Sequence, residues 1–152
     1  MTRAPATPWT CPECHRQFAR TKQSHDCAPA MTIDEYFSTG PVHERPVFDA
    51  VMQGLTDAGI RGVHVEPVSV GIFLKNPHKF AELRTMTRWT AISFSLRRRA
   101  THRTITRKVV PYGGRYHHVA NVADPAGVDD GLVALLVEAY ESALTRRSDT
   151  SG

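Results

Sequence analysis

The sequence has little cysteine and no long run of apolar residues. Its 152 residues include three cysteines, all within residues 11–27, and no apolar stretch of the length of a membrane span. The first residues lack the apolar segment of a secretory signal, so we expect a cytoplasmic protein with reduced thiols and no membrane partner. The motifs of nucleotide-binding loops, zinc proteases and serine hydrolases are also missing. We therefore assign no catalytic residues and rank a non-catalytic role ahead of an enzymatic one.

Acidic residues are missing from one long part of the chain. No Asp or Glu occurs from Leu83 to Ala123, within a protein of formal net charge +4. The basic residues that we expect to form a positive surface there are Arg97, Arg98, Arg99, Arg103, Arg107 and Lys108. Such a surface attracts nucleic acid or another polyanion, and Arg16, Arg20 and Lys22 could extend it. The alternative is a solvated basic loop that keeps a hairpin soluble.

A compact set of metal-binding side chains is present near the N-terminus. Cys11, Cys14, His25 and Cys27 have the spacing C-x2-C-x10-H-x-C. Two close pairs of ligands separated by a short loop suit tetrahedral Zn²⁺, and four protein ligands indicate a structural ion. His15 is an alternative fourth ligand, but it directly follows Cys14, which makes the geometry awkward. Redox-active or unused thiols are the other interpretation.

The segment around these ligands is too short to fold on apolar residues alone. Trp9, Phe18 and the four ligands are almost its only core-forming residues, so metal binding must supply the folding free energy. Phe18 resembles the aromatic residue that follows the first ligand pair in C2H2 zinc fingers. The short interval to His25 leaves no room for a recognition helix. We expect a zinc module over residues 9–28, after a mobile tail at residues 1–8.

The rest of the chain predicts an α+β domain over residues 31–146, followed by a tail at 147–152. The predicted helices are 31–37, 42–58 and 128–144. Thr32 and Glu35 predict a capping box in the first of them. The predicted strands are 63–68, 70–75, 79–86, 89–96, 104–110 and 115–122. Short connections favour an antiparallel sheet of about five to six strands, with two N-terminal helices and one C-terminal helix.

The alternation of residues predicts one apolar and one polar face for this sheet. Ile92, Phe94 and Leu96 are expected to pack under the helices, which leaves Ser93 and Ser95 on the other face. In the strand at 79–86, the residues expected to share the polar face are Phe80, Glu82 and Arg84.

The polar face offers a possible small-molecule site. Lys75, Glu82 and Arg84 could line a pocket for an anion, with Arg107, Lys108 and His117 nearby. Pairing of Glu82 with Arg84 or Arg107 inside the protein is the favoured alternative. The isolated histidines His64, His78 and His102 are expected at the surface.

Several short motifs follow one another in an order that resembles a known bacterial family. These are Met31-Thr32-Ile33-Asp34-Glu35-Tyr36-Phe37, Gly71-Ile72-Phe73-Leu74-Lys75, Phe80-Ala81-Glu82-Leu83-Arg84, Arg107-Lys108-Val109-Val110, and Val128-Asp129-Asp130 with Glu138-Ala139-Tyr140. The succession resembles domain of unknown function 5655 over about residues 31–146. Chains of this type often carry an N-terminal CPxC…SHxC element like the one here. The resemblance implies the α+β fold and no established activity.

Three functions are consistent with the sequence. The first is a zinc-containing protein that binds nucleic acid or another polyanion through its basic surface, with strong salt dependence. The second is a small-molecule anion-binding domain or enzyme with its pocket near Glu82 and Arg84. The third is a protein–protein adaptor in which zinc orders the interface. We rank polyanion binding first.

Overall fold

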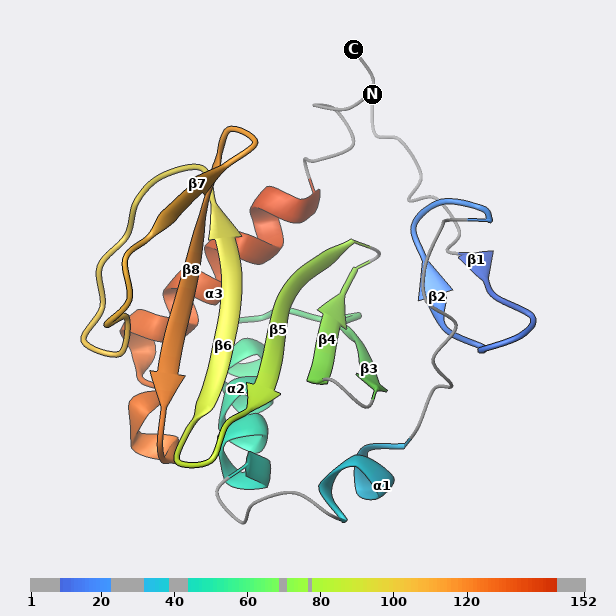
Figure 1. Ribbon diagram of the computed structural model, residues 1–152, viewed down its shortest axis with the longest axis horizontal. Helices are drawn as coiled ribbons and strands as arrows, with labels where there is room; N and C mark the ends of the chain where they lie inside the picture. Colours follow the sequence, from blue (N-terminus) through green and yellow to red (C-terminus); the bar gives the residue numbers. More distant parts are fainter. Residues whose placement is uncertain (1–8, 23–31, 39–43, 69–70, 77, 145–152) are drawn as a thin grey trace.

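The computed structural model describes residues 9–22, 32–38, 44–68, 71–76 and 78–144 (Figure 1). In chain order its elements are β1 (Trp9–Thr10), β2 (Gln17–Phe18), α1 (Ile33–Phe37), α2 (Glu44–Asp57), β3 (His64–Val68), β4 (Gly71–Lys75), β5 (Lys79–Thr85), β6 (Thr90–Leu96), β7 (Val110–Tyr112), β8 (Arg115–Val122), the 3-10 helix η1 (Pro125–Gly127) and α3 (Asp130–Leu144). The expected tails and the predicted ligands His25 and Cys27 lie outside the described residues.

The strands form two sheets. Six of them make one antiparallel sheet in the order β3-β4-β5-β6-β8-β7, and β1 pairs with β2 in a separate hairpin. The expected antiparallel α+β architecture is thus confirmed. None of the described helices is both long enough and apolar enough to span a bilayer.

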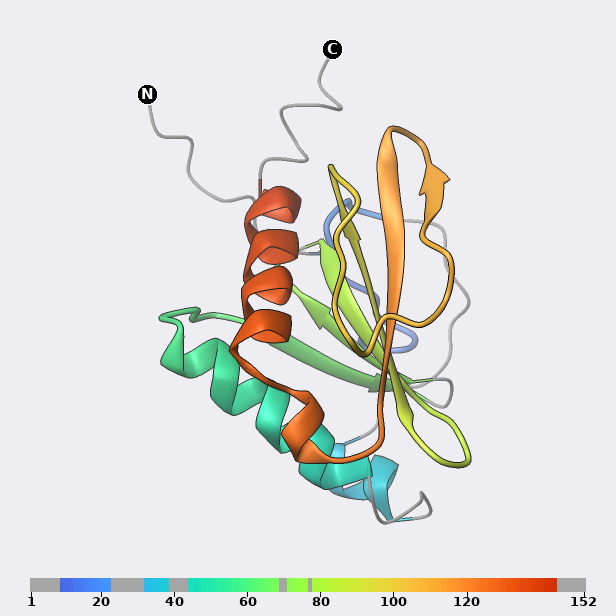
Figure 2. The same cartoon turned by 90° about the vertical axis from the view of Figure 1, so that its left-hand side faces the viewer.

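Two helices cover one face of the large sheet (Figure 2). The core between them includes Val51 and Leu55 of α2 and Leu136 of α3, each at most 1% exposed. Ile92 and Phe94 of β6 lie in the same core, as their alternation predicted. The helices α2 and α3 approach closely at Gly54, where an added Cβ would lie 2.5 Å from Val133 Cγ2.

The layout of the helices differs in part from the expectation. Thr32 and Glu35 form the predicted capping box of α1, which is only five residues long. The 3-10 helix η1 precedes α3, and the hairpin β1–β2 precedes α1. At the end of α2, Gly59 adopts φ +88° while Ile60 N donates to Leu55 O, so this glycine ends the helix.

The strand predicted at 104–110 is wrong. Only β7 forms in this region, and it begins at Val110. The preceding segment forms turns instead, because Ile105 N donates to the carbonyl of His102 at 2.9 Å. Thr104 O accepts from Asn121 N at 2.9 Å, which holds the segment as a loop beside β8.

A β-bulge changes the predicted faces of β5. Leu74 pairs with Ala81 while Lys75 pairs with Lys79, so Phe80 is an extra residue with no cross-strand partner on β4. Phe80 therefore lies on the helix side with Ala81, and its ring meets that of Tyr140 edge-on at 5.3 Å between centroids. The expectation that Phe80 shares the polar face was wrong, because alternation cannot register an inserted residue.

Candidate functional site

The turn between β1 and β2 brings Cys11 and Cys14 together. Cys11 N donates to Arg16 O at 2.9 Å, and His15 N donates to Cys11 O at 2.8 Å. His15 takes a left-handed φ of 61°, which reverses the chain directly after Cys14. Both cysteines are buried in a small cluster with Phe18, whereas His15 is exposed. This arrangement is compatible with one pair of zinc ligands and disfavours His15 as the alternative fourth ligand.

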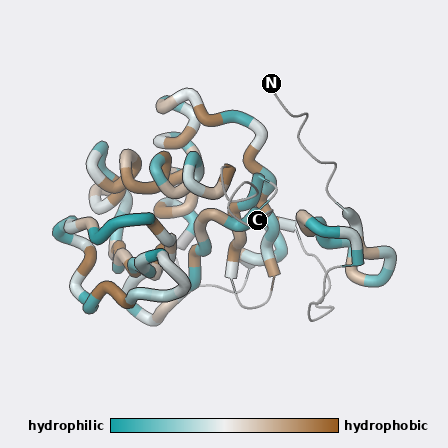
Figure 3. Tube along the Cα trace, turned by 90° about the horizontal axis from the view of Figure 1, so that it is seen from above, coloured by the Kyte–Doolittle hydropathy of each residue, from teal (hydrophilic) through white to brown (hydrophobic). Residues whose placement is uncertain are grey.

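Two of the four predicted zinc ligands, Cys11 and Cys14, lie within the described residues. Cys11 and Cys14 form no disulfide with each other. Within the described ranges, no group of three or more His, Cys, Asp or Glu is placed to hold a metal, and His25 and Cys27 are not among those residues. The hairpin has few apolar residues, as its largely hydrophilic colouring shows (Figure 3). A zinc ion bound by the predicted ligands would supply the missing folding free energy.

A buried network of charges docks the hairpin on β3 and β4. Glu66 Oε1 accepts from Arg16 Nε and from Lys75 Nζ, each at 2.9 Å. Glu66 Oε2 accepts from Gln17 N at 3.1 Å, and Lys75 Nζ also donates to Gln17 O at 2.9 Å. The side chains of Arg16, Glu66 and Lys75 are only 8%, 2% and 8% exposed. The hairpin is therefore packed against the α+β domain.

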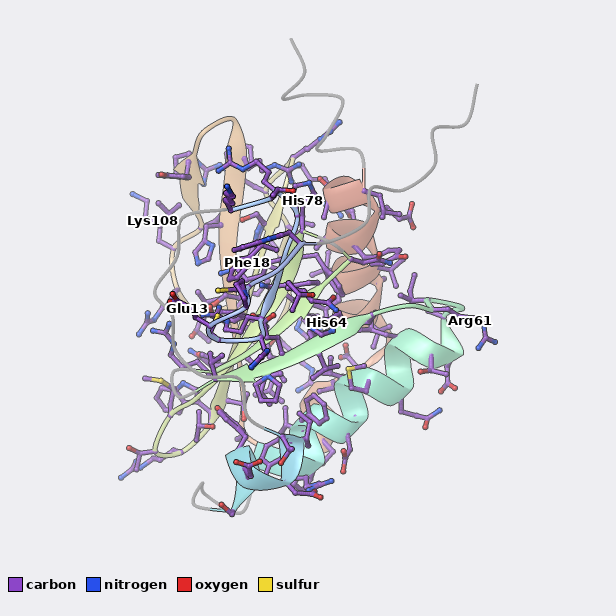
Figure 4. The ribbon with its side chains drawn as sticks, turned by 90° about the vertical axis from the view of Figure 1, so that its right-hand side faces the viewer. Glu13, Phe18, Arg61, His64, His78 and Lys108 are labelled. Atoms are coloured by element: carbon purple, nitrogen blue, oxygen red, sulfur yellow. The ribbon has the colours of Figure 1, made fainter. Side chains whose placement is uncertain are left out.

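Aromatic rings enclose the charges of this network. Lys75 Nζ lies 4.5 Å from the ring centroid of Phe18, and Arg16 Cζ lies 5.2 Å from it. Figure 4 shows Phe18 on the hairpin, in front of the sheet. Phe73 of β4 borders the same two cations, at 5.9 and 5.6 Å. Arg16 is thus buried and does not extend a basic surface, and Lys75 pairs here with Glu66.

Glu66 remains ionised in this environment. Burial by itself raises the pKa of Glu66, but hydrogen bonds from His64, Lys75 and Arg16 outweigh burial and lower the pKa to about 2. Burial lowers the pKa of Lys75, which its bond to Glu66 opposes. The sequence signal for this network was a glutamate within the valine-rich strand β3 and a lysine at the end of the apolar strand β4.

A pocket of about 250 Å³ opens where strand β5 diverges from its neighbour β6. The pairing of β5 with β6 ends at Ala81 and Phe94, whereas Ser95 continues to pair with His117 of β8. The bulge at Phe80 accompanies this divergence, and β5 curves away from β6 at its start (Figure 1). The residues that line the pocket are Lys79, Phe80, Ala81, Glu82, Ser93, Phe94, Ser95, Tyr112, Arg115, His117, Ala139 and Ala143.

The polar groups of the pocket carry more positive than negative charge. Lys79 and Arg115 are cations, and Glu82 is the one carboxylate in the described lining. Glu82 pairs with Arg84 at 3.3 Å, which is one of the two internal pairs expected from the sequence, and it also pairs with Lys79 at 3.3 Å. Arg84 itself is exposed and does not line the pocket. Arg115 donates to Ser142 Oγ at 2.7 Å, which orients its guanidinium from α3.

The protein itself engages part of the basic segment. Arg98 makes a bidentate pair with Glu138 at 2.8 and 3.0 Å. Arg99 donates to Val109 O at 3.3 Å. Arg103 binds Ala126 O at 2.9 Å and Asp129 at 3.4 Å.

The other basic residues of the segment are exposed. Arg97 lines a second surface hollow with residues of α3. Arg107 and Lys108 are exposed and have no hydrogen bond or ion pair with other described residues.

His102 anchors the loop that carries these arginines. Its Nε2 lies 2.7 Å from Asp129 Oδ1, and its Nδ1 lies 2.7 Å from Thr104 Oγ1. The side chain of His102 is only 9% exposed, so its expected place at the surface was wrong. Asp129 also accepts from Leu132 N at the start of α3, and that bond and the one from His102 lower the pKa of Asp129 to about 2.

His118 should make stability depend on pH near neutrality. Its Nε2 accepts from Ala100 N at 3.0 Å, and its fully buried ring stacks on Phe94. Burial lowers the pKa of His118, which the backbone of Tyr116 and the charge of Glu138 oppose, and the nearby His117 and Arg98 lower the pKa further. Because the pKa is lower in the folded than in the unfolded state, the contribution of neutral His118 to the free energy of unfolding is fully present above about pH 6.5. This contribution is lost as the pH drops below that value.

We expect the substitution His118→Gln to flatten this dependence. Gln can still accept from Ala100 N but does not titrate. Denaturant unfolding of both proteins at pH 7.5, 6.5 and 5.5 checks this. Wild type should lose more stability than the variant between pH 6.5 and 5.5, and equal losses would contradict the assignment.

The fold and site define a class of protein: an α+β domain with two helices on one face of a six-stranded antiparallel sheet, and a pocket at a strand divergence. The chain belongs to the family described as a domain of unknown function (DUF5655), whose model matches residues 33–143. The match begins after the hairpin. No curated protein and no solved structure is significantly similar to the chain.

Proposed function

We propose that this protein is a zinc-stabilised domain that binds a small anion in the pocket between β5 and β6. The observation that carries the proposal is the convergence of Lys79 and Arg115 with the hydroxyl-bearing Ser93 and Ser95 on one cavity. Phe94, at the same cavity, supplies an apolar wall. Ligand pockets commonly combine an apolar lining with a few convergent polar groups.

The size and charge of the pocket restrict the ligand. About 250 Å³ is slightly smaller than most small-molecule sites, so the ligand is metabolite-sized and smaller than a dinucleotide. Lys79 and Arg115 favour a carboxylate or phosphate group, because charge-assisted hydrogen bonds are stronger than neutral ones. Glu82 can accept a hydroxyl or amine of the same ligand. We assign no chemical step to these residues.

Binding of inorganic phosphate, succinate and acetate to the zinc-loaded full chain tests the proposal. Amide chemical shifts should change at Ser93, Ser95 and His117 during titration with at least one of these probes. Lys79→Gln should weaken that binding by about tenfold, since a hydrogen bond to a charged group contributes roughly 1.5–3 kcal/mol.

Arg84→Gln is the matched control for Lys79→Gln. Both side chains contact Glu82, but only Lys79 lines the pocket. Binding should therefore be retained in Arg84→Gln. Shift changes that avoid the pocket, or equal losses in both variants, would contradict the proposal.

A second candidate function is binding of nucleic acid or another polyanion. The specific observation is that Arg107 and Lys108 are exposed, lie in the acid-free segment, and have no described partner. Phosphate contacts by such cations release counterions, so affinity falls steeply with salt. Arg98 and Arg103 are less suited to this role because each already pairs with a carboxylate.

Fluorescence anisotropy with labelled DNA and RNA across a salt series tests this second candidate. The double variant Arg107→Ala/Lys108→Ala should weaken binding and reduce the slope of log affinity against log salt by about 2. Arg98→Ala is the control, and it should leave the slope unchanged. No binding at low salt would leave the segment as a solvated loop.

The structural zinc ion is the remaining part of the proposal. Cys11, Cys14, His25 and Cys27 would hold it with a closed coordination sphere. The buried pair of thiols in the β1–β2 turn supports this part. Its test is the substitution of Cys11 that is described in the Discussion.

A further inference from the structure

We infer that the residues Glu66 and Lys75, which hold the docked hairpin, set the affinity of the protein for zinc although they are not ligands. This inference rests on the proposed zinc site. Glu66 and Lys75 belong to β3 and β4, and both are bonded to the backbone of Gln17, three residues after Cys14. The α+β domain and the metal would thus stabilise the same hairpin.

The docking contacts are specific to the folded hairpin. Gln17 N donates to Glu66 and Gln17 O accepts from Lys75, so the sheet satisfies both backbone groups of one β2 residue. Arg16 adds a buried pair to Glu66, and Phe18 covers Lys75 at 4.5 Å. These contacts require β2 to be extended with its residues in the observed register. A hairpin that has lost its turn cannot make them together.

Zinc is required for that folded hairpin. Its strands are two residues each, and its buried cluster consists of Cys11, Cys14 and Phe18 with Trp9 packed against it. So small a cluster cannot hold the turn without metal. When zinc dissociates, the docking contacts are therefore lost. Thermodynamic linkage is reciprocal, so the free energy of docking contributes to zinc affinity. Zinc binding in turn protects the amides of β3 and β4 from hydrogen exchange.

Zinc loading therefore also decides whether part of the open sheet face is covered. The hairpin lies over Phe73 and Lys75, on the face opposite the helices. In the metal-free protein, these side chains and Glu66 would meet solvent. The pocket lining includes none of the three, so this coupling goes beyond the proposed ligand site.

The test is a competition titration of zinc against a chromophoric chelator, with the full chain. We expect Lys75→Met to weaken zinc affinity by about tenfold, within the 5–150-fold range common for coupled sites. Glu66→Gln leaves two buried cations unpaired in the docked hairpin, so it should weaken zinc affinity by about a hundredfold or more. Glu138→Gln, which breaks the exposed pair with Arg98, is the control and should leave zinc affinity unchanged. Circular dichroism establishes that each variant keeps its helices.

A second measurement needs no substitution. Removal of zinc from wild type by a chelator should speed hydrogen exchange of amides in β3 and β4, and leave β6 and β8 protected. The exchange measurement on wild type tests the coupling even if a variant fails to fold. Unchanged zinc affinity in both folded variants, or unchanged exchange in β3 and β4, would overturn the coupling alone. A full chain that binds no zinc would remove the metal site and the coupling with it, while the pocket proposal could still stand.

Discussion

Glu66→Gln is expected to lower the free energy of unfolding by about 3–5 kcal/mol, because it leaves Arg16 and Lys75 charged and buried without a counter-ion. The two cations have side chains 8% exposed, so water screens them little. Glu66 is also the acceptor for Gln17 N, and that bond loses its charge assistance. Chemical denaturation at pH 7.5 with saturating zinc measures the loss.

Two comparisons make this prediction specific. Glu138→Gln removes a carboxylate from an exposed pair with Arg98 and should cost at most about 1 kcal/mol. A variant that replaces the whole network by apolar residues, Arg16→Met/Glu66→Leu/Lys75→Met, should be more stable than Glu66→Gln, because no buried charge is left uncompensated. A loss below about 1 kcal/mol for Glu66→Gln would mean that the network is not buried in solution.

Cys11→Ser is expected to remove zinc from the protein and to unfold the hairpin. Metal binding contributes roughly 10–16 kcal/mol to the folding of small zinc-finger peptides, so loss of one thiolate should be decisive. The α2–α3–sheet core contains none of the hairpin residues and should remain folded. Zinc content of the purified chain and hydrogen exchange of residues 9–22 measure the two effects.

The same experiment separates the alternatives for the ligand set. Cys14→Ser should behave like Cys11→Ser, whereas His15→Ala should retain zinc because His15 is exposed. Retention of stoichiometric zinc by Cys11→Ser would contradict the assignment. Loss of all cooperative unfolding in that variant would show that the docked hairpin is needed for the whole domain to fold.

The sequence predicted those features that depend on local patterns. The capping box of Thr32 and Glu35 follows from side chains three residues apart, and the burial of Ile92 and Phe94 follows from strand alternation. The family resemblance expected over about residues 31–146 is confirmed over 33–143. These signals need no knowledge of tertiary contacts.

The features that the sequence did not predict depend on contacts between distant segments. Arg16 lies 50 residues from Glu66 along the chain, so local pattern could not show that it is buried. The bulge at Phe80 shifts the register by one residue, which alternation cannot detect. His102 appeared isolated in the sequence because its partner Asp129 is 27 residues away. The pocket consequently uses Glu82 from the predicted set but neither Lys75 nor Arg84.

Zinc K-edge X-ray absorption of the full chain, together with its zinc content, is the decisive measurement for the proposed metal site. A structural site of Cys11, Cys14, His25 and Cys27 predicts stoichiometric zinc with three sulfur neighbours at about 2.3 Å and one nitrogen at about 2.0–2.1 Å. Chains without zinc, or zinc surrounded only by oxygen and nitrogen, would contradict the metal-organised hairpin on which the docking and coupling depend.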